Sequence, residues 1–256
     1  MDKLAVELLT LISFFACTDG GRTGAALSLV SKRIHYASRP ARFYSVSLID
    51  SATQIELFLK CYQAECTRSS DTTLRIRHLC LSFFGKGINI SPTPLPAQPA
   101  SREEFLASQQ RRAQFWRSAQ DRLDEQYNRA VPELIRAIAA DIETLSLIQT
   151  QWRCSTTIDC CFPRLEELTL VGGDPTFLPF TAVSSDRPIY PALKRLHHVP
   201  SIANRQVDFF QWATHAPNLT HLRVSRMSAY PEVTANSLLQ VMSQLDLSFT
   251  HHALSN

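Results

Sequence analysis

The sequence has little glycine, no long apolar run and no excess of one charge. Glycine makes up 7 of the 256 residues, which excludes a collagen-like or glycine-rich low-complexity chain. No apolar stretch reaches the roughly 18 residues of a membrane-spanning helix, so we expect no membrane partner. The 26 basic and 23 acidic side chains leave a net charge of +3. Such an even balance does not favour nucleic acid as a partner.

Recognisable catalytic motifs are also missing. There is no Gly-x-Ser-x-Gly and no His-Glu-x-x-His, the patterns of α/β-hydrolases and zinc proteases. The glycine-rich segment Asp19–Gly24 lacks the Gly-Lys-Ser/Thr of a phosphate loop and follows no expected strand, so we read it as a turn between helices. We expect neither enzymatic activity nor a cofactor.

The cysteines do not form a pattern of disulfides or zinc ligands. Their number is odd, their spacing is irregular and no Cys-x-x-Cys occurs; they are Cys17, Cys61, Cys66, Cys80, Cys154, Cys160 and Cys161. Reduced thiols, mostly in the core, are therefore expected in a cytoplasmic or nuclear protein. His197 and His198 are neighbours in an expected strand, where they point to opposite faces and cannot readily share a metal.

Helical spacing dominates the first 40 residues. Apolar residues recur at i, i+4, i+7, i+8 and i+11, which predicts one face of a helix; they are Leu4, Leu8, Leu11, Ile12 and Phe15. After the turn Thr18–Gly24, a second helix is expected from Ala25 to Ser38. Pro40 forbids its continuation. The beginning of the chain is thus predicted to be a small helical unit.

From Phe43 onward, expected strands alternate with expected helices, which is typical of an α/β protein. Strands are predicted at 44–48, 74–84 and 142–148, and a helix at 54–66. Residues 85–100 hold four prolines and are expected to form an extended loop. Ser101-Arg102-Glu103-Glu104 is a capping box that opens a long helix to about Ala130. A shorter helix is expected from Pro132 to Ala140.

A repeated motif is the most informative feature of the second half. Phe162–Leu170, Tyr190–His198 and Ala216–Val224 share the form Pro-x-Leu-x-x-Leu-x-φ, where φ is typically apolar, and their prolines lie 28 and then 26 residues apart. Ile76–Leu81 and Ile142–Leu147 have the same shape without the proline. These spacings lie in or near the 20–29-residue range of leucine-rich repeats. An ordinary α/β domain with chance Pro-x-Leu strands is the alternative.

Residues 4–48 resemble an F-box. Leu4-Ala5-Val6-Glu7-Leu8-Leu9 stands where that family has Leu-Pro-x-Glu-Leu-Leu, and Val30-Ser31-Lys32-Arg33-Ile34 matches its Val-Cys-Lys-Arg-Trp-like helix. Ala5 replaces the family proline, Ile34 replaces the tryptophan, and Thr18–Gly24 is an insertion. The whole chain is similar to fungal proteins that join a degenerate F-box to degenerate leucine-rich repeats.

The resemblance implies a fold and a function. The fold is α/β, with an F-box-like helical domain at 1–42 and a leucine-rich-repeat-like solenoid at 43–256, into which the Pro-rich loop and long helix at 85–130 are inserted. The function is that of a substrate-recognition adaptor, which docks a Skp-type subunit of a cullin ubiquitin ligase and holds an unknown protein substrate. The candidate adaptor-binding residues, which could equally form the core of the helical unit, are Leu4, Leu8, Leu9, Ile12 and Val30.

Two alternatives remain open from the sequence. The helical unit could be only the N-terminal cap of a non-catalytic repeat scaffold, because repeat arrays need capped ends. The chain could also be an unrecognised enzyme or an RNA-binding protein. The helix at 101–130 holds six arginines around Phe115 and Trp116, but also five acids, and that net charge of +1 favours a solvated helix.

Overall fold

A computed structural model describes residues 4–49, 51–68, 74–83, 101–149, 160–172, 188–199, 209–225, 235–236 and 238–240. Three helices come first: α1 (Val6–Ala16), α2 (Arg22–Val30) and α3 (Lys32–Ser38). The alternating part follows as β1 (Ser45–Ile49), α4 (Ala52–Arg68), β2 (His78–Phe83), α5 (Arg102–Ile138), β3 (Thr144–Gln149), β4 (Glu167–Gly172), β5 (Arg195–Val199), α6 (Phe209–His215) and β6 (His221–Val224).

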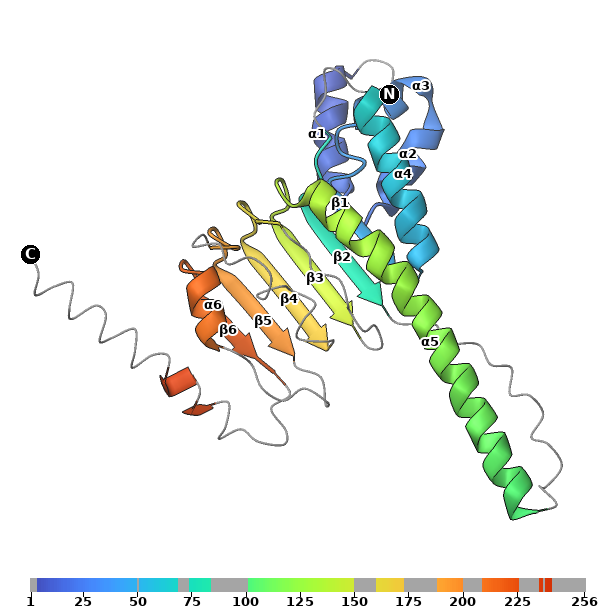
Figure 1. Cartoon of the computed structure of the whole chain (residues 1–256). Helices are drawn as coiled ribbons and strands as arrows, with labels where there is room; N and C mark the ends of the chain where they lie inside the picture. Colours follow the sequence, from blue (N-terminus) through green and yellow to red (C-terminus); the bar gives the residue numbers. More distant parts are fainter. Residues whose placement is uncertain are drawn as a thin grey trace, which may run out of the picture.

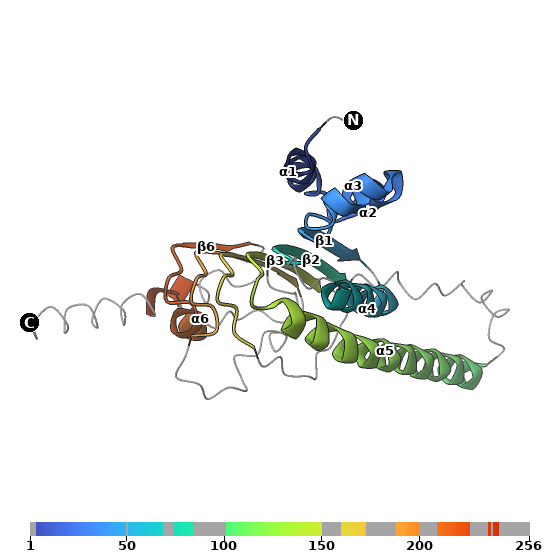
Figure 2. The same ribbon diagram turned by 90° about the horizontal axis from the view of Figure 1, so that it is seen from above.

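The strands form one parallel sheet whose spatial order equals their order in the chain, β1-β2-β3-β4-β5-β6. Helices α4, α5 and α6 lie on one side of this sheet, and the unit α1–α3 stands at its β1 end (Figures 1 and 2). The prediction of an α/β protein is therefore confirmed.

The repeated motif stacks in register across the sheet. Each strand brings the second leucine of its motif, or its equivalent, to the same level: Val46, Leu79, Leu145, Leu168, Leu196 and Leu222. The backbone repeats as well. The carbonyl of Glu143 accepts from the N–H groups of Glu166 and Glu167, and the carbonyl of Glu166 accepts from those of Lys194 and Arg195. The leucines thus occupy equivalent register positions across one parallel sheet.

Aromatic rings fill the core beneath the last repeats. Phe162 and Tyr190, each directly before the motif proline, stack with ring centroids 5.3 Å apart. The next copy has Ala216 at this position, and the missing ring is supplied by Trp212 of α6, 5.7 Å from Tyr190. All four residues are buried. This exchange keeps a continuous aromatic stack through a repeat that lacks its own ring.

The prediction of one helix from Ala25 to Ser38 is wrong. The chain breaks at Ser31, which has an extended backbone with φ −162° and ψ 161°. Its Oγ accepts a hydrogen bond from the N–H of Ile34, 3.2 Å away, so Ser31 is the N-cap of α3. Apolar spacing continues through the break and conceals it.

The predicted division of the next helices is also wrong. A single helix of 37 residues, α5, contains Pro132 in its interior. Proline removes one backbone hydrogen bond there, but Val131, Leu134, Ile135 and Ile138 around it are all buried in the core. Their packing offsets the loss. The strand expected at 74–84 is shorter, because β2 begins at His78; the Pro-rich loop at 85–100 lies outside the described residues.

Candidate protein-docking surface

Helix α1 has an apolar side that faces solvent. The residues of this outer face of α1 are Leu4, Leu8, Leu11, Ile12 and Phe15, with exposed fractions between 38% and 76%. The predicted helical face therefore exists, but its side chains are largely exposed and are not packed against the other residues that the structure describes. Exposed apolar patches of this kind mark sites where a soluble protein meets a partner.

The side of α1 that faces the protein carries both apolar and polar residues, and Phe14 on that side packs against Tyr44. Leu9 and Ser13 are its buried residues, and Ser13 Oγ donates to the carbonyl of Leu9 at 2.7 Å. Thr10 Oγ1 donates to the carbonyl of Ala37 in α3 at 2.9 Å. A helix whose only role is to close a bundle buries its apolar stripe and exposes its polar one. In α1 apolar side chains lie on both sides, and most of the large ones are exposed.

The candidate docking residues thus fall into two environments. Leu8 and Ile12 lie together on the outer face of α1, and Leu4 lies just before the helix on the same side. Leu9 belongs to the inner side and is buried. Val30 is the last residue of α2 and is 63% exposed, beside the 86% exposed Leu29. Leu11, Phe15 and Leu29 were missed as docking candidates, and their exposure is visible only in the structure.

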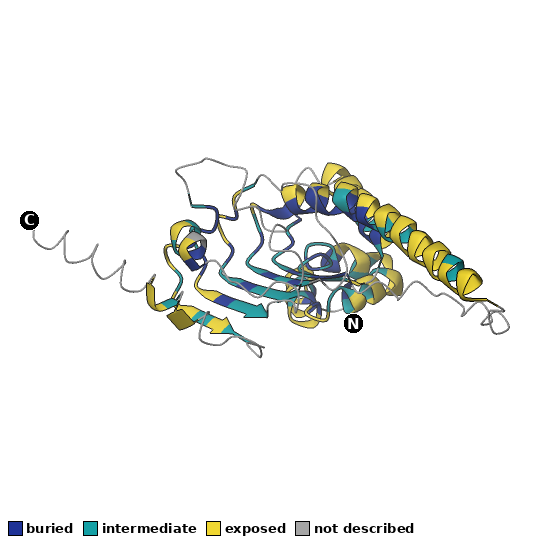
Figure 3. Cartoon of the chain, turned by 60° about the horizontal axis from the view of Figure 1, so that its bottom comes forward, coloured by how far each residue is buried: buried dark blue, intermediate teal, exposed yellow. Residues whose placement is uncertain are grey.

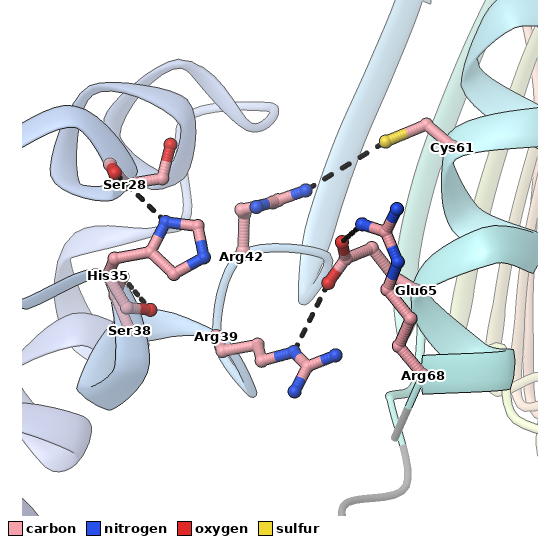
Figure 4. A network of polar contacts seen from close by, with 8 residues as sticks. All are labelled: Ser28, His35, Ser38, Arg39, Arg42, Cys61, Glu65 and Arg68. Atoms are coloured by element: carbon pink, nitrogen blue, oxygen red, sulfur yellow. Dashed lines mark hydrogen bonds and ion pairs between the residues drawn. The ribbon is translucent and has the colours of Figure 1, made fainter. Parts of the chain in front are cut away.

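Polar contacts hold α2 and α3 together and fix the helical unit to α4 (Figure 4). The Nδ1 atom of His35 lies 2.9 Å from the carbonyl oxygen of Ser28, which joins α3 to α2. Arg39 Nε forms an ion pair with Glu65 Oε2 at 3.2 Å. Burial alone would raise the pKa of Glu65, but Arg42, Arg39 and Arg68 outweigh it and lower that pKa. The carboxylate therefore stays charged and anchors the unit.

The turn between α1 and α2 contacts the first strand. Asp19 accepts hydrogen bonds from the N–H and Oγ1 of Thr23, and these bonds lower the pKa of Asp19. The carbonyl of Gly20 accepts from the N–H of Ser47 in β1 at 3.1 Å. The turn is shorter than predicted, because Arg22, Thr23 and Gly24 already belong to α2. The residues before them form a structural turn that seats the helical unit on β1.

The face of the sheet away from α4, α5 and α6, called the open face below, carries polar rows of side chains and, toward the ends of the strands, a mostly apolar row of Ile49, Ser82, Ile148, Val171 and Val199. One row of side chains runs across it in register: Ser47, Cys80, Ser146, Thr169, His197 and Arg223. Next to the helical unit, a hollow of about 330 Å³ is lined by Asp19, Ser47, His78 and Ser146 among others. Burial lowers the pKa of His78, and its Nδ1 lies 2.8 Å from Thr144 Oγ1.

Neither a metal cluster nor a membrane helix is found in the described part of the chain. No group of three or more His, Cys, Asp or Glu side chains there could hold a metal ion. Among the helices of the same residues, none combines the length and the apolar character needed to cross a bilayer. His197 and His198 do face opposite ways: Nε2 of His197 lies 3.0 Å from Ser225 Oγ, whereas Nδ1 of His198 is buried.

No family model, curated protein or solved structure matches the chain.

Proposed function

We propose that this chain is a protein-binding adaptor of the F-box type. In this proposal the helical unit at 1–42 docks a Skp-type subunit of a cullin ubiquitin ligase. The remainder is a degenerate leucine-rich-repeat solenoid that holds a protein substrate. The ligase's other subunits supply the chemistry, so the chain needs no catalytic residue of its own.

The outer face of α1 carries the proposal. Five large apolar side chains there are 38–76% exposed, and burial of what remains exposed of each in a partner's groove would stabilise a complex by about 1 kcal/mol, roughly half the value for a fully exposed side chain. Insertion of one apolar helical face into a groove is a recurring mode of protein recognition. The equivalent leucines of the parallel sheet support the repeat part of the proposal, because stacked repeats bury a continuous core and present extended surfaces for binding.

The alternative of a scaffold with a terminal cap is supported by the contacts of the helical unit with the sheet. Phe14 packs edge-on against Tyr44, with ring centroids 5.4 Å apart, and Tyr44 packs against His78 of β2 at 4.9 Å. A cap would use this inner surface and carry a polar outer one. The apolar outer face of α1 favours the adaptor.

Calorimetric titration of the full chain with a purified Skp-type adaptor tests the proposal. Leu8→Asp and Ile12→Asp each place a charge on the outer face and should weaken binding at least about tenfold. Leu57→Asp is the matched control, because Leu57 is 61% exposed on α4, outside the helical unit. Circular dichroism should show all three variants folded. Absence of binding by the wild-type chain, or an equal loss in the Leu57 variant, would refute the proposal.

A further inference from the structure

The first part of α5 extends away from the rest of the protein. This arm, residues 102–122, projects beyond α4 and the sheet (Figure 1) and is coloured almost entirely as exposed (Figure 3). None of its residues is buried, and the first buried residue of α5 is Asp124. The second half of α5 supplies core residues and is tied to α4 by an ion pair between Arg129 and Glu56. The arm therefore has a fixed base and an open surface.

Charge is sorted along the arm. From Phe105 to Gln120 there are three arginines and no acidic residue, which gives this stretch a charge of +3. The acids lie outside it, at Glu103 and Glu104 before it and at Asp121 after it. The small net charge of the whole helix thus hides a basic middle section. Arg111, Arg112 and Arg117 are all exposed.

Aromatic rings lie among these arginines on one side of the arm. Phe105, Arg112 and Phe115 follow each other at intervals of seven and three residues, which keeps them on one side of an α-helix. Trp116 is four residues from Arg112 and about 20° around the helix from Phe105, so it lies on the same side. Phe105, Phe115 and Trp116 have exposed fractions of 46%, 52% and 41%. Arg117 is two residues from Phe115, about 200° around the helix, and so lies on the opposite side.

This pattern distinguishes between classes of partner. A protein groove selects a continuous apolar ridge at i, i+3, i+4 and i+7, but Gln109 and Arg112 interrupt the ridge between Phe105 and Trp116. A single-stranded nucleic acid alternates flat bases with phosphates. Its bases stack on aromatic and guanidinium planes, and its phosphates pair with arginine. We propose that the aromatic–arginine side of the arm binds single-stranded nucleic acid, a site independent of the proposed adaptor function.

Fluorescence anisotropy of the full chain with a labelled oligouridylate, at about 50 mM salt, is the direct test. Binding should weaken with salt, with a logarithmic slope of about −1.4, because two arginines lie on this side, Arg112 and Arg111 four residues before Phe115, and each releases roughly 0.7 counterion. Arg112→Glu should reduce affinity at least about tenfold, and Phe115→Ala with Trp116→Ala should reduce it with little change of the salt slope.

Arg117→Glu is the matched control, because it makes the same charge change on the other side of the arm. It should cost clearly less affinity than Arg112→Glu, and Leu8→Asp should cost none. No binding at low salt would overturn the proposal, and so would equal losses in the Arg112 and Arg117 variants. Competition by polyglutamate as effective as that by oligouridylate would also overturn it, in favour of an acidic protein partner.

Discussion

The N–H of Ser47 in β1 donates to the carbonyl of Gly20, 3.1 Å away, in the turn between α1 and α2. Gly20 has a φ of +76°, and a Cβ built on it would lie 2.7 Å from Ser47 Cβ. The position needs glycine both for its backbone conformation and for the closeness of β1. The close contact between this turn and β1 thus requires glycine at position 20.

Gly20→Ala should therefore destabilise the protein by about 1–3 kcal/mol. Gly21→Ala is the control, because Gly21 also has a positive φ, of +98°, but its nearest contact for a Cβ is Ser45 O at 3.6 Å. Gly21→Ala should lower the free energy of unfolding only by the cost of a positive φ for alanine, about 1 kcal/mol. Urea denaturation measures both. Equal losses would show that the contact with Ser47 contributes nothing.

His198 should make stability depend on pH. Burial, with a smaller effect of His197, lowers the pKa of His198 from 6.5 to about 4. The unfolded chain therefore binds the proton more readily than the folded one. The free energy of unfolding is therefore not reduced by His198 above pH 6.5, and it decreases as the pH falls from 6.5 toward 4.

His198→Leu should remove that part of the pH dependence. The same register position is Leu81 in β2, Leu147 in β3 and Leu170 in β4, so leucine fits the repeat. The substitution should also stabilise the protein by about 1–2 kcal/mol, because it replaces with apolar surface a buried nitrogen for which the described residues supply no hydrogen-bond partner. Urea midpoints at about pH 7 and pH 5 test both effects.

Trp212 should be essential to the last repeats. Trp212→Ala removes the ring that continues the stack of Phe162 and Tyr190 and should cost about 3–5 kcal/mol. Phe210→Ala removes a ring of the same helix that is 61% exposed and should stay within about 0.5 kcal/mol of the wild type. Thermal unfolding followed by circular dichroism measures the difference. Similar melting temperatures for the two variants would contradict the stacking account.

The sheet could be predicted from the sequence because its signal repeats. Leu168, Leu196 and Leu222 occur in equivalent motifs, and equivalent motifs place their residues in register when they stack. The helix break at Ser31 was missed because a single capping serine competes with apolar spacing that continues past it. Pro132 was taken for a helix start because local sequence does not report the tertiary packing that tolerates it.

The docking surface could be predicted only in part. The spacing of Leu8, Ile12 and Phe15 defines a face of α1, but spacing alone does not say whether that face meets the core or the solvent. The orientation of α1 also depends on the hydroxyl groups of Thr10 and Ser13. They point to the inner side of the helix, where each donates a hydrogen bond to a backbone carbonyl. Leu9 was grouped with the docking residues because it adjoins Leu8 in the F-box-like motif, although consecutive helical residues point about 100° apart.

Hydrogen exchange of the full chain, with and without a purified Skp-type adaptor, tests the central claim most directly. The account predicts that the adaptor slows exchange in α1 and at the end of α2, where Val30 lies, and leaves the strands of the sheet unchanged. Protection confined to the open face of the sheet, or none at saturating adaptor, would contradict it and leave the helical unit as the cap of a repeat scaffold.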